Sequence, residues 1–234
     1  MSNSYFQFKQ FVVRQDRCAM KVGTDGTLLG AWARGGRTVL DIGTGTGLLA
    51  LMMAQRFPEA RVTAIDIDAE AVVQARENVE ASPFSDRITV VEGDITASFS
   101  NSSTLPFDAI VCNPPYFNDS LTCPDRQRTT ARHTTTLSYA DLMAVARQLL
   151  ADDGELSVVI PFDCKARLES EAALAGLFKC RECSVRTTSR KAPRRHLLAF
   201  SRHPARLEVT EGVLETSPGQ RSDWYHELTK DFYL

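Results

Sequence analysis

The sequence lacks several features that would assign it to a specialised class of protein. Its longest apolar stretches have only the length of a strand, and the first twenty residues carry Lys9, Arg14, Asp16 and Arg17 where a signal peptide has its apolar core. We therefore expect neither a signal peptide nor a membrane span, and a cytoplasmic location. With 234 residues, 43% of them hydrophobic, the chain suits one globular domain with a substantial core.

The six cysteines are scattered and do not suggest a disulfide framework. Only Cys180 and Cys183 form a CxxC pair, and neither a second CxxC nor an HxxxH pair accompanies them. Because a zinc site needs about four ligands, we interpret the pair as ordinary strand cysteines and expect no metal site.

Charge is nearly balanced over the whole chain, at a formal net charge of -2, but it is unevenly distributed. Residues 179–206 hold nine basic side chains and one acid, Glu182, which gives this segment a net charge of +8. From charge alone, a solvated edge and a surface for a polyanion are equally good interpretations. If the polyanion is RNA, the candidate contacts are Arg186, Arg190, Lys191, Arg194 and Arg195.

Short apolar runs rich in Val and Ile alternate with segments of helical period, which indicates parallel βαβ units. Strands are predicted at 38–42, 61–65, 88–91, 107–112 and 155–160, with a turn at 152–154 and a closing antiparallel pair at 183–188 and 196–201. Helices are predicted at 47–56, 69–81, 137–150 and 165–178. The predicted fold is α/β, a Rossmann-like, doubly wound and mostly parallel sheet of seven strands. Residues 1–37 are predicted to be a short N-terminal extension and 38–234 the main domain.

A glycine-rich turn follows the first predicted strand. Asp41 lies near the end of that strand, and Gly43, Gly45 and Gly47 follow it with GxGxG spacing. A tight turn beside a ligand needs glycine, because a Cβ would block both the positive φ angles and the close approach of the backbone. A dinucleotide fingerprint has GxGxxG spacing, so the turn is weak evidence for a pyrophosphate site.

Two acids stand at the ends of the next two predicted strands. Asp66 is placed to accept hydrogen bonds from a ribose diol, and Asp94 is placed to accept one from an adenine amino group. Ile67 and Ile95 offer apolar faces to the base. Either acid alone could be an ordinary carboxylate in a strand-end turn, but their order and spacing favour a nucleoside site.

This combination resembles the class I S-adenosylmethionine-dependent methyltransferases over residues 38–160. The resemblance implies S-adenosyl-L-methionine as the cofactor, with its ribose on Asp66 and its adenine on Asp94. It also implies that the methionine end of the cofactor lies over Gly43 to Gly47, the turn that begins after Asp41.

The tetrapeptide Asn113-Pro114-Pro115-Tyr116 directly follows the fourth predicted strand. The side-chain oxygen of Asn113 and the carbonyl of Pro114 can accept both N–H bonds of a planar amine, and Tyr116 can stack on its ring. A turn without catalytic function is the alternative. In this fold, however, the tetrapeptide is typical of methyltransferases that act on the amino group of adenine, guanine or glutamine.

Further motifs are similar to those of one bacterial family, the tRNA (adenine-N6) methyltransferases that modify the adenine beside the anticodon, position 37, of a valine tRNA. They are Phe8-Lys9-Gln10-Phe11, residues 16–26, Tyr116-Phe117, residues 132–137 and residues 194–198. The resemblance implies that Lys21 belongs to a cofactor-closing motif and that the partner is the anticodon arm of a tRNA. A monomer without an obligate protein partner is expected.

Three other enzymatic functions remain open: glutamine methylation of a release factor, guanine-N2 methylation of ribosomal RNA, and adenine methylation of DNA. The release-factor enzymes carry a helical N-terminal domain, whereas only about forty residues precede the glycine turn here. A non-catalytic RNA-binding module is a further alternative, and the complete set of glycines, acids and Asn113 argues against it.

Overall fold

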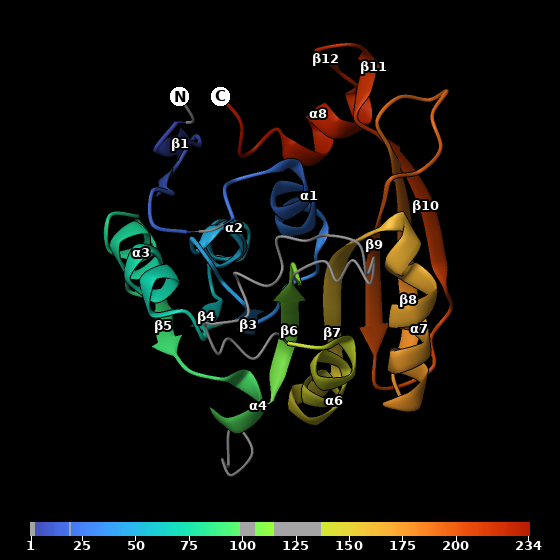
Figure 1. Cartoon of the computed structure of the whole chain (residues 1–234), viewed down its shortest axis with the longest axis horizontal. Helices are drawn as coiled ribbons and strands as arrows, with labels where there is room; N and C mark the ends of the chain where they lie inside the picture. Colours follow the sequence, from blue (N-terminus) through green and yellow to red (C-terminus); the bar gives the residue numbers. More distant parts are fainter. Residues whose placement is uncertain (1–2, 19, 99–105, 115–136) are drawn as a thin grey trace, which may run out of the picture.

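The computed structural model describes residues 3–18, 20–98, 106–114 and 137–234. A sheet of eight strands runs through it in the order β10-β8-β9-β7-β6-β3-β4-β5 (Figure 1). The strands are β3 (Thr38–Ile42), β4 (Arg61–Asp66), β5 (Ile88–Glu92), β6 (Phe107–Cys112), β7 (Leu150–Pro161), β8 (Phe178–Arg186), β9 (Arg195–Ser201) and β10 (Glu208–Val213). Strand β9 is antiparallel to β7 and β8, and the other neighbouring pairs are parallel.

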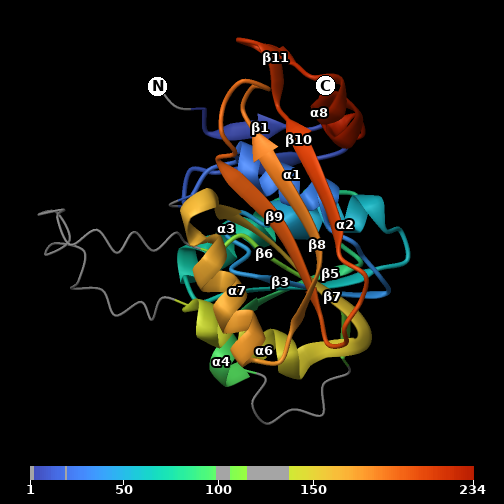
Figure 2. The same cartoon turned by 90° about the vertical axis from the view of Figure 1, so that its right-hand side faces the viewer.

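The predicted α/β class, the doubly wound order and the closing antiparallel pair are confirmed, but the predicted number of strands is wrong. The eighth strand, β10, lies at the edge of the sheet beside β8 (Figure 2). Its first four residues are exposed, so it lacks the apolar pattern by which a strand is recognised in a sequence. Strand β8 also begins at Phe178, earlier than predicted.

The turn predicted at residues 152–154 is a bulge inside β7. The partner of β6 jumps from Leu150 at Phe107 to Glu155 at Ala109. Residues 151–154 are therefore extra length in one continuous strand. The sequence Asp-Asp-Gly is typical of either structure, and only the pairing with β6 distinguishes them.

Helices cover both faces of the sheet (Figure 1). The helices are α1 (Thr24–Trp32), α2 (Leu48–Arg56), α3 (Ala69–Glu80), α4 (Ile95–Ser98), α6 (Tyr139–Leu149), α7 (Lys165–Leu174) and α8 (Asp223–Thr229), with a 3-10 turn, η1 (Phe162–Cys164). Helices α1, α2, α3 and α8 share one apolar core, and α6 and α7 share the other, in which Ile95 of α4 is also buried. No helix in the described ranges is both long and apolar enough to cross a membrane.

Alternate residues of the central strands supply these two cores. Val39 of β3 belongs to the core of α2, whereas Leu40 belongs to the core of α6. Because successive side chains in a strand point to opposite faces, a strand buried on both sides has a continuous apolar sequence. The apolar runs in the sequence therefore correspond to the centre of the sheet.

The N-terminal residues form a hairpin of β1 (Tyr5–Gln7) and β2 (Val12–Arg14), which packs against the main domain. Phe8, Phe11 and Val13 are buried in the core that contains α2. The hairpin lies beside the C-terminal segment, since Lys9 donates its backbone N–H to the carbonyl of Phe232 at 2.8 Å. A second small hairpin, β11 (Glu215–Ser217) with β12 (Gln220–Arg221), precedes α8. The division of the chain at residue 37 stays a prediction.

Candidate active site

The glycine turn between β3 and α2 is open on the side where a ligand can approach. The φ angles of Gly43, Gly45 and Gly47 are 68°, 56° and 81°, so all three have the left-handed conformation that favours glycine. A Cβ added to Gly43 or Gly45 would meet nothing within 4 Å, whereas one on Gly47 would contact Ala75 at 3.5 Å. The first two glycines therefore form a cradle, and Gly47 allows α2 to pack closely on α3.

Asp41 lies beneath this turn and holds it to α2. Its Oδ2 atom accepts hydrogen bonds from the hydroxyl of Thr44 at 2.6 Å and the backbone N–H of Ala50 at 3.1 Å. Its Oδ1 atom is buried and has no hydrogen-bond partner among the described residues. Burial raises the pKa of Asp41 to about 7, although the bonds from Thr44 and Ala50 oppose the shift. Asp41 therefore supports the turn from beneath.

Asp66, at the end of β4, is bonded to the same turn. Its Oδ2 atom accepts from the backbone N–H of Gly45 at 2.8 Å, and its Oδ1 atom accepts from the backbone N–H of Asp68 at 3.0 Å. An ionised carboxylate has about four acceptor positions, so these two bonds leave room for a ribose diol. The hydrogen bond from Gly45 to Asp66 also fixes the distance between the glycine turn and the end of β4.

Asp94 follows β5 and begins the short helix α4. Its Oδ1 atom accepts from both the backbone N–H and the hydroxyl of Thr96, at 2.9 and 2.7 Å. Ile95 is buried, whereas the side chain of Ile67 is 41% exposed and can cover one face of a base. The acid and the two isoleucines thus lie where the sequence predicts them, after two neighbouring strands.

A cavity of about 550 Å³ brings most of the predicted residues together, and this volume suits a small-molecule site. Its lining includes Gly43, Gly45, Asp66, Ile67, Asp94, Ile95, Asn113 and Pro114. A second cavity, of about 370 Å³, contains Lys21, Asp25 and Arg195, and it shares Gly43, Gly45 and Asn113 with the first. Asp41 and Gly47 line neither cavity, which agrees with their positions beneath the turn.

Asn113 occupies the boundary between the two cavities, immediately after β6. Its amide nitrogen donates a hydrogen bond to the sulfur of Met20 at 3.7 Å. This contact uses the NH2 end of the amide, whereas the predicted chemistry needs the oxygen. Pro114 is buried beside it. Tyr116 lies outside the described residues, and so do Pro115, Phe117 and residues 132–136, so their roles stay predictions.

Two buried polar side chains of α3 hold the N-terminal segment beside the site. Asn78 accepts from the backbone N–H of Arg14 at 2.8 Å and donates to the carbonyls of Arg14 and Thr46, at 2.9 and 2.8 Å. Gln74 accepts from the backbone N–H of Arg17 at 3.1 Å. Sequence reasoning missed both residues. The available signal was two amides spaced i, i+4 on the otherwise apolar stripe of this helix.

The predicted RNA-binding residues lie at the same end of the sheet as these cavities, the end where the parallel strands have their carboxyl ends. Both β7 and β8 pair antiparallel to β9, so the end of β8 and the start of β9 adjoin the carboxyl ends of the parallel strands. Arg195 lies within 2.6 Å of Asp25 of α1, and Arg186 within 3.2 Å of Glu211 of β10. Arg190, Lys191 and Arg194 are exposed in the connecting loop and make no ion pair with the described residues.

The net charge of residues 179–206 is not all available to a polyanion. Lys179 pairs with Glu182 and Glu169, each at 2.6 Å, and Arg202 pairs with Asp152 at 3.3 Å. Arg181 is buried against Glu155 and lies 3.9 Å from the centre of the Trp32 ring. These cations pair with acids, as Arg186 and Arg195 also do. The basic residues of this segment that are exposed and make no ion pair with the described residues are Arg190, Lys191, Arg194 and Arg206.

Comparison with known proteins decides the family. The methyltransferase small domain family matches residues 27–190. Two curated proteins, each named tRNA1(Val) (adenine(37)-N6)-methyltransferase, cover all of this chain and 99% of their own length. The one from Phocaeicola vulgatus is 51% identical and the one from Bacteroides thetaiotaomicron is 47% identical. The chain belongs to this methyltransferase family.

Solved structures extend the likeness to the fold. A predicted O-methyltransferase from Agrobacterium tumefaciens superposes with a TM-score of 0.69 at 23% identity, over 89% of this chain and 96% of its own. TrmN from Thermus thermophilus superposes with a TM-score of 0.52 at 24% identity, over 75% of this chain and 46% of its own. At such identities these likenesses concern the fold alone. They agree with the doubly wound sheet of the methyltransferase family.

Proposed function

We propose that the protein transfers a methyl group from S-adenosyl-L-methionine to the N6 atom of adenine 37 in a valine tRNA. The observation that carries the proposal is the position of Asn113. It lies on the boundary shared by the glycine-turn cavity and the cavity that contains Lys21, in a chain 51% identical to a relative named for this reaction. A nucleoside in the first cavity and an acceptor amine beside Asn113 would therefore be neighbours.

The residues of the first cavity fit the cofactor. The cradle over Gly43 and Gly45 is space that a Cβ would fill, and Asp66 and Asp94 provide carboxylate oxygens after adjacent strands. S-adenosylmethionine, when bound, supplies a methyl group on a positively charged sulfur. In this proposal Asp66 holds the ribose, Asp94 and Ile67 hold the adenine, and Lys21 closes the methionine end.

Asn113 and Pro114 orient the acceptor amine. The lone pair of an aromatic amine is delocalised into its ring, so the amine is a weak nucleophile. Two acceptors that take both N–H bonds favour the pyramidal amine and fix the direction of its lone pair, which is catalysis by orientation. Since the amine is neutral, no strong base is needed before transfer, and the proton can leave to water. Tyr116 is proposed to stack on the adenine.

The loop of Arg190, Lys191 and Arg194 is proposed to contact phosphates of the anticodon arm. Bases in RNA loops are already partly exposed, so the target adenine can be swung out at low cost. Residues 1–37 are proposed to be the extension that closes over the cofactor and faces the RNA. We further propose that the protein acts as a monomer in the cytoplasm.

An acceptor assay separates this function from its alternatives. Labelled S-adenosylmethionine is offered with tRNA from cells that lack the protein, with release factor, with ribosomal RNA, or with DNA. We expect label in the tRNA, in N6-methyladenosine. Label in release factor as methylglutamine, or in ribosomal RNA as N2-methylguanosine, with none in tRNA, would contradict the proposal.

A further inference from the structure

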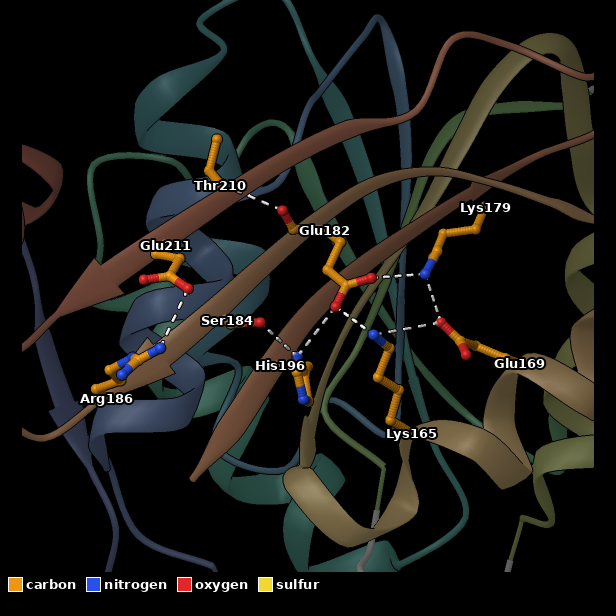
Figure 3. Close-up of polar contacts among 9 residues, drawn as sticks. All are labelled: Lys165, Glu169, Lys179, Glu182, Ser184, Arg186, His196, Thr210 and Glu211. Atoms are coloured by element: carbon orange, nitrogen blue, oxygen red, sulfur yellow. Dashed lines mark hydrogen bonds and ion pairs between the residues drawn. The ribbon is translucent and has the colours of Figure 1, made fainter. Parts of the chain in front are cut away.

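A third cavity, of about 600 Å³, lies apart from the two that contain Asn113. Its lining comes from η1, the start of α7, the neighbouring strands β8 and β9 and the loop between them, and it includes Phe162, Asp163, Lys165, Glu182, Ser184 and His196. Figure 3 shows five of its polar residues, Lys165, Glu169, Glu182, Ser184 and His196, with some of their neighbours. We call it the His196 basin, and the proposed reaction makes no use of it.

The His196 basin and a cavity that contains Asn113 are lined by consecutive residues of β9. Arg195 and His196 are consecutive residues at the start of β9, so their side chains point to opposite faces of the sheet. Arg195 lines a cavity together with Asn113, whereas His196 lines the basin. A nucleotide close to the target adenine could therefore reach the basin by passing over the carboxyl end of the sheet.

The basin carries more negative than positive formal charge: the lysines Lys165 and Lys179 pair with Glu169 and Glu182, and the exposed Asp163 adds a third carboxylate. The carboxylate of Glu182 is hydrogen-bonded to the ammonium groups of Lys165 and Lys179, and Glu169 pairs with both lysines (Figure 3). Burial disfavours the charged form of Glu182, but these bonds lower its pKa below the usual value. Such a wall does not attract a phosphate or a carboxylate, and it suits an uncharged ligand.

His196 adds a directional hydrogen-bonding group to this wall. The side chain is 3% exposed, and its Nδ1 atom lies 3.2 Å from the Ser184 hydroxyl and 3.5 Å from the carboxylate of Glu182. Burial and the charge of Lys165 lower the pKa of His196, so the ring is neutral. Because a carboxylate favours the N–H on the nitrogen that faces it, Nε2 is left as a hydrogen-bond acceptor.

The Nε2 atom of His196 is buried and has no hydrogen-bond partner among the residues that the structure describes. It lies on the side of the ring away from Ser184 and Glu182 (Figure 3). Phe162 stacks on the histidine with ring centres 5.3 Å apart, yet its own side chain is 49% exposed. Because Nε2 is buried, a ligand that bonds to it must first displace a neighbouring side chain, and the half-exposed Phe162 ring stacked on His196 is the candidate.

We propose that the His196 basin binds a second nucleobase of the tRNA, one close in sequence to the methylated adenine; this inference rests on the proposed function. The base stacks on Phe162 and donates an N–H of its edge to Nε2 of His196. Its phosphate lies at the rim, where Arg194 is exposed and its carbonyl accepts from the backbone N–H of Phe162 at 3.0 Å. Every nucleobase can present an N–H, so the basin recognises a splayed base, not one sequence.

A binding experiment that does not depend on methyl transfer tests the proposal. Anticodon stem-loops carry 2-aminopurine at single positions beside adenine 37, and its fluorescence reports stacking when the protein is added. We expect quenching at one position with the wild-type protein and its loss in Phe162→Leu, which keeps an apolar side chain of similar size. The control is Phe178→Leu, since Phe178 is 42% exposed at the far end of β8. This variant should quench as the wild type does.

Removal of the base at the reporting position then tests whether that base contacts Phe162. An abasic site at the reporting position should raise the Kd of the wild-type protein by roughly 5- to 100-fold, the usual range for one stacked base, and that of Phe162→Leu by less than about twofold. Imidazole nitrogen NMR should show the Nε2 resonance of His196 move on binding of the intact stem-loop and not of the abasic one. Equal losses in both proteins, or an unmoved resonance, would show that the basin binds no base of the stem-loop.

The experiments distinguish failure of this subsite from failure of the proposed function. If adenine 37 is methylated but abasic sites weaken wild-type and Phe162→Leu proteins equally, only the subsite is wrong. If no tRNA accepts a methyl group while release factor or ribosomal RNA does, the proposed function is wrong, whatever the basin binds.

Discussion

The two sides of the catalytic edge are held together in different ways. On the cofactor side, formed by β3, β4 and β5, Asp41, Asp66 and Asp94 each accept from a backbone N–H that follows within nine residues, and Asp66 also accepts from the more distant Gly45. On the RNA side, formed by β8 and β9, charged side chains pair across elements distant in sequence, as Arg181 does with Glu155. Short-range backbone contacts leave a pattern in the sequence, and long-range pairs of side chains do not.

The largest expected effect comes from breaking a pair on the RNA side that we interpret as structural. Arg181→Ala removes the contact with Trp32 and leaves the buried Glu155 with weaker contacts, among them the Ser157 hydroxyl at 3.0 Å and the longer ion pair to Arg34 at 3.7 Å. Loss of one member of a buried pair costs about 3–5 kcal/mol, so we expect a fall of this size in the free energy of unfolding measured by urea denaturation. A fall below about 1 kcal/mol would mean that the pair contributes little to stability.

Asn113→Ala tests the boundary between the two sides. We expect kcat to fall by about 100- to 1000-fold, as when one oriented group is removed from an active site, while the Kd for the cofactor changes by less than about threefold. Single-turnover kinetics and calorimetry measure the two quantities. Turnover at the wild-type rate in this variant would refute the role of Asn113.

Gly45→Ala tests the cradle on the cofactor side. The φ angle of 56° makes alanine cost about 1 kcal/mol of stability, and the new Cβ occupies the open side of the turn. We expect the affinity for the cofactor to fall about tenfold or more, measured by calorimetry. Gly219→Ala is the matched control, because Gly219 has a φ angle of 78° and equal free space in the hairpin of β11 and β12. It should show the same loss of stability with unchanged affinity.

Arg190→Gln combined with Lys191→Gln tests the part of the RNA side that we assign to binding. Both residues are exposed, so the free energy of unfolding should change by less than about 0.5 kcal/mol. The slope of log K against log salt for tRNA should become shallower by about 1 to 2. Fluorescence anisotropy over a salt series measures this slope. An unchanged slope would show that the phosphate contacts lie on another surface.

The smallest effect concerns pH and the cofactor side. Burial raises the pKa of Asp41 from its ordinary value of 3.8 to about 7, so the folded protein holds this proton more tightly than the unfolded chain. The resulting stability is present below about pH 4 and is lost as the pH rises through about 7. Asp41→Asn keeps the shape without the charge. We expect it to lose less stability than the wild type from about pH 5 to about pH 8 in urea denaturation. If the free energy of unfolding changes with pH in the same way in the wild type and in Asp41→Asn, this expectation is wrong.

The same contrast explains how much could be predicted from the sequence. The ends of β3 and β6 were predicted to the residue, and most predicted members of the cofactor site line one cavity, because glycines and acids at strand ends depend on local chain geometry. Charge counting could not separate Arg181, which is buried in a pair, from Arg190, which is exposed. That distinction depends on where Glu155 lies after folding.

The N-terminal segment shows a second limit of prediction. Its motif indicated a role at the cofactor site, but nothing local revealed that Asn78 and Gln74 of α3 hold its backbone. The edge strand β10 was missed for the same reason, since its place beside β8 depends on backbone pairing and not on an apolar pattern.

Nucleoside mass spectrometry of the valine tRNA from a deletion strain tests the central claim most directly. N6-methyladenosine at position 37 should be absent from the deletion strain, return when the wild-type gene is restored, and remain absent with the Asn113→Ala gene. The modification persisting in the deletion strain, or returning with the Asn113→Ala gene, would contradict the assignment of this site to adenine methylation.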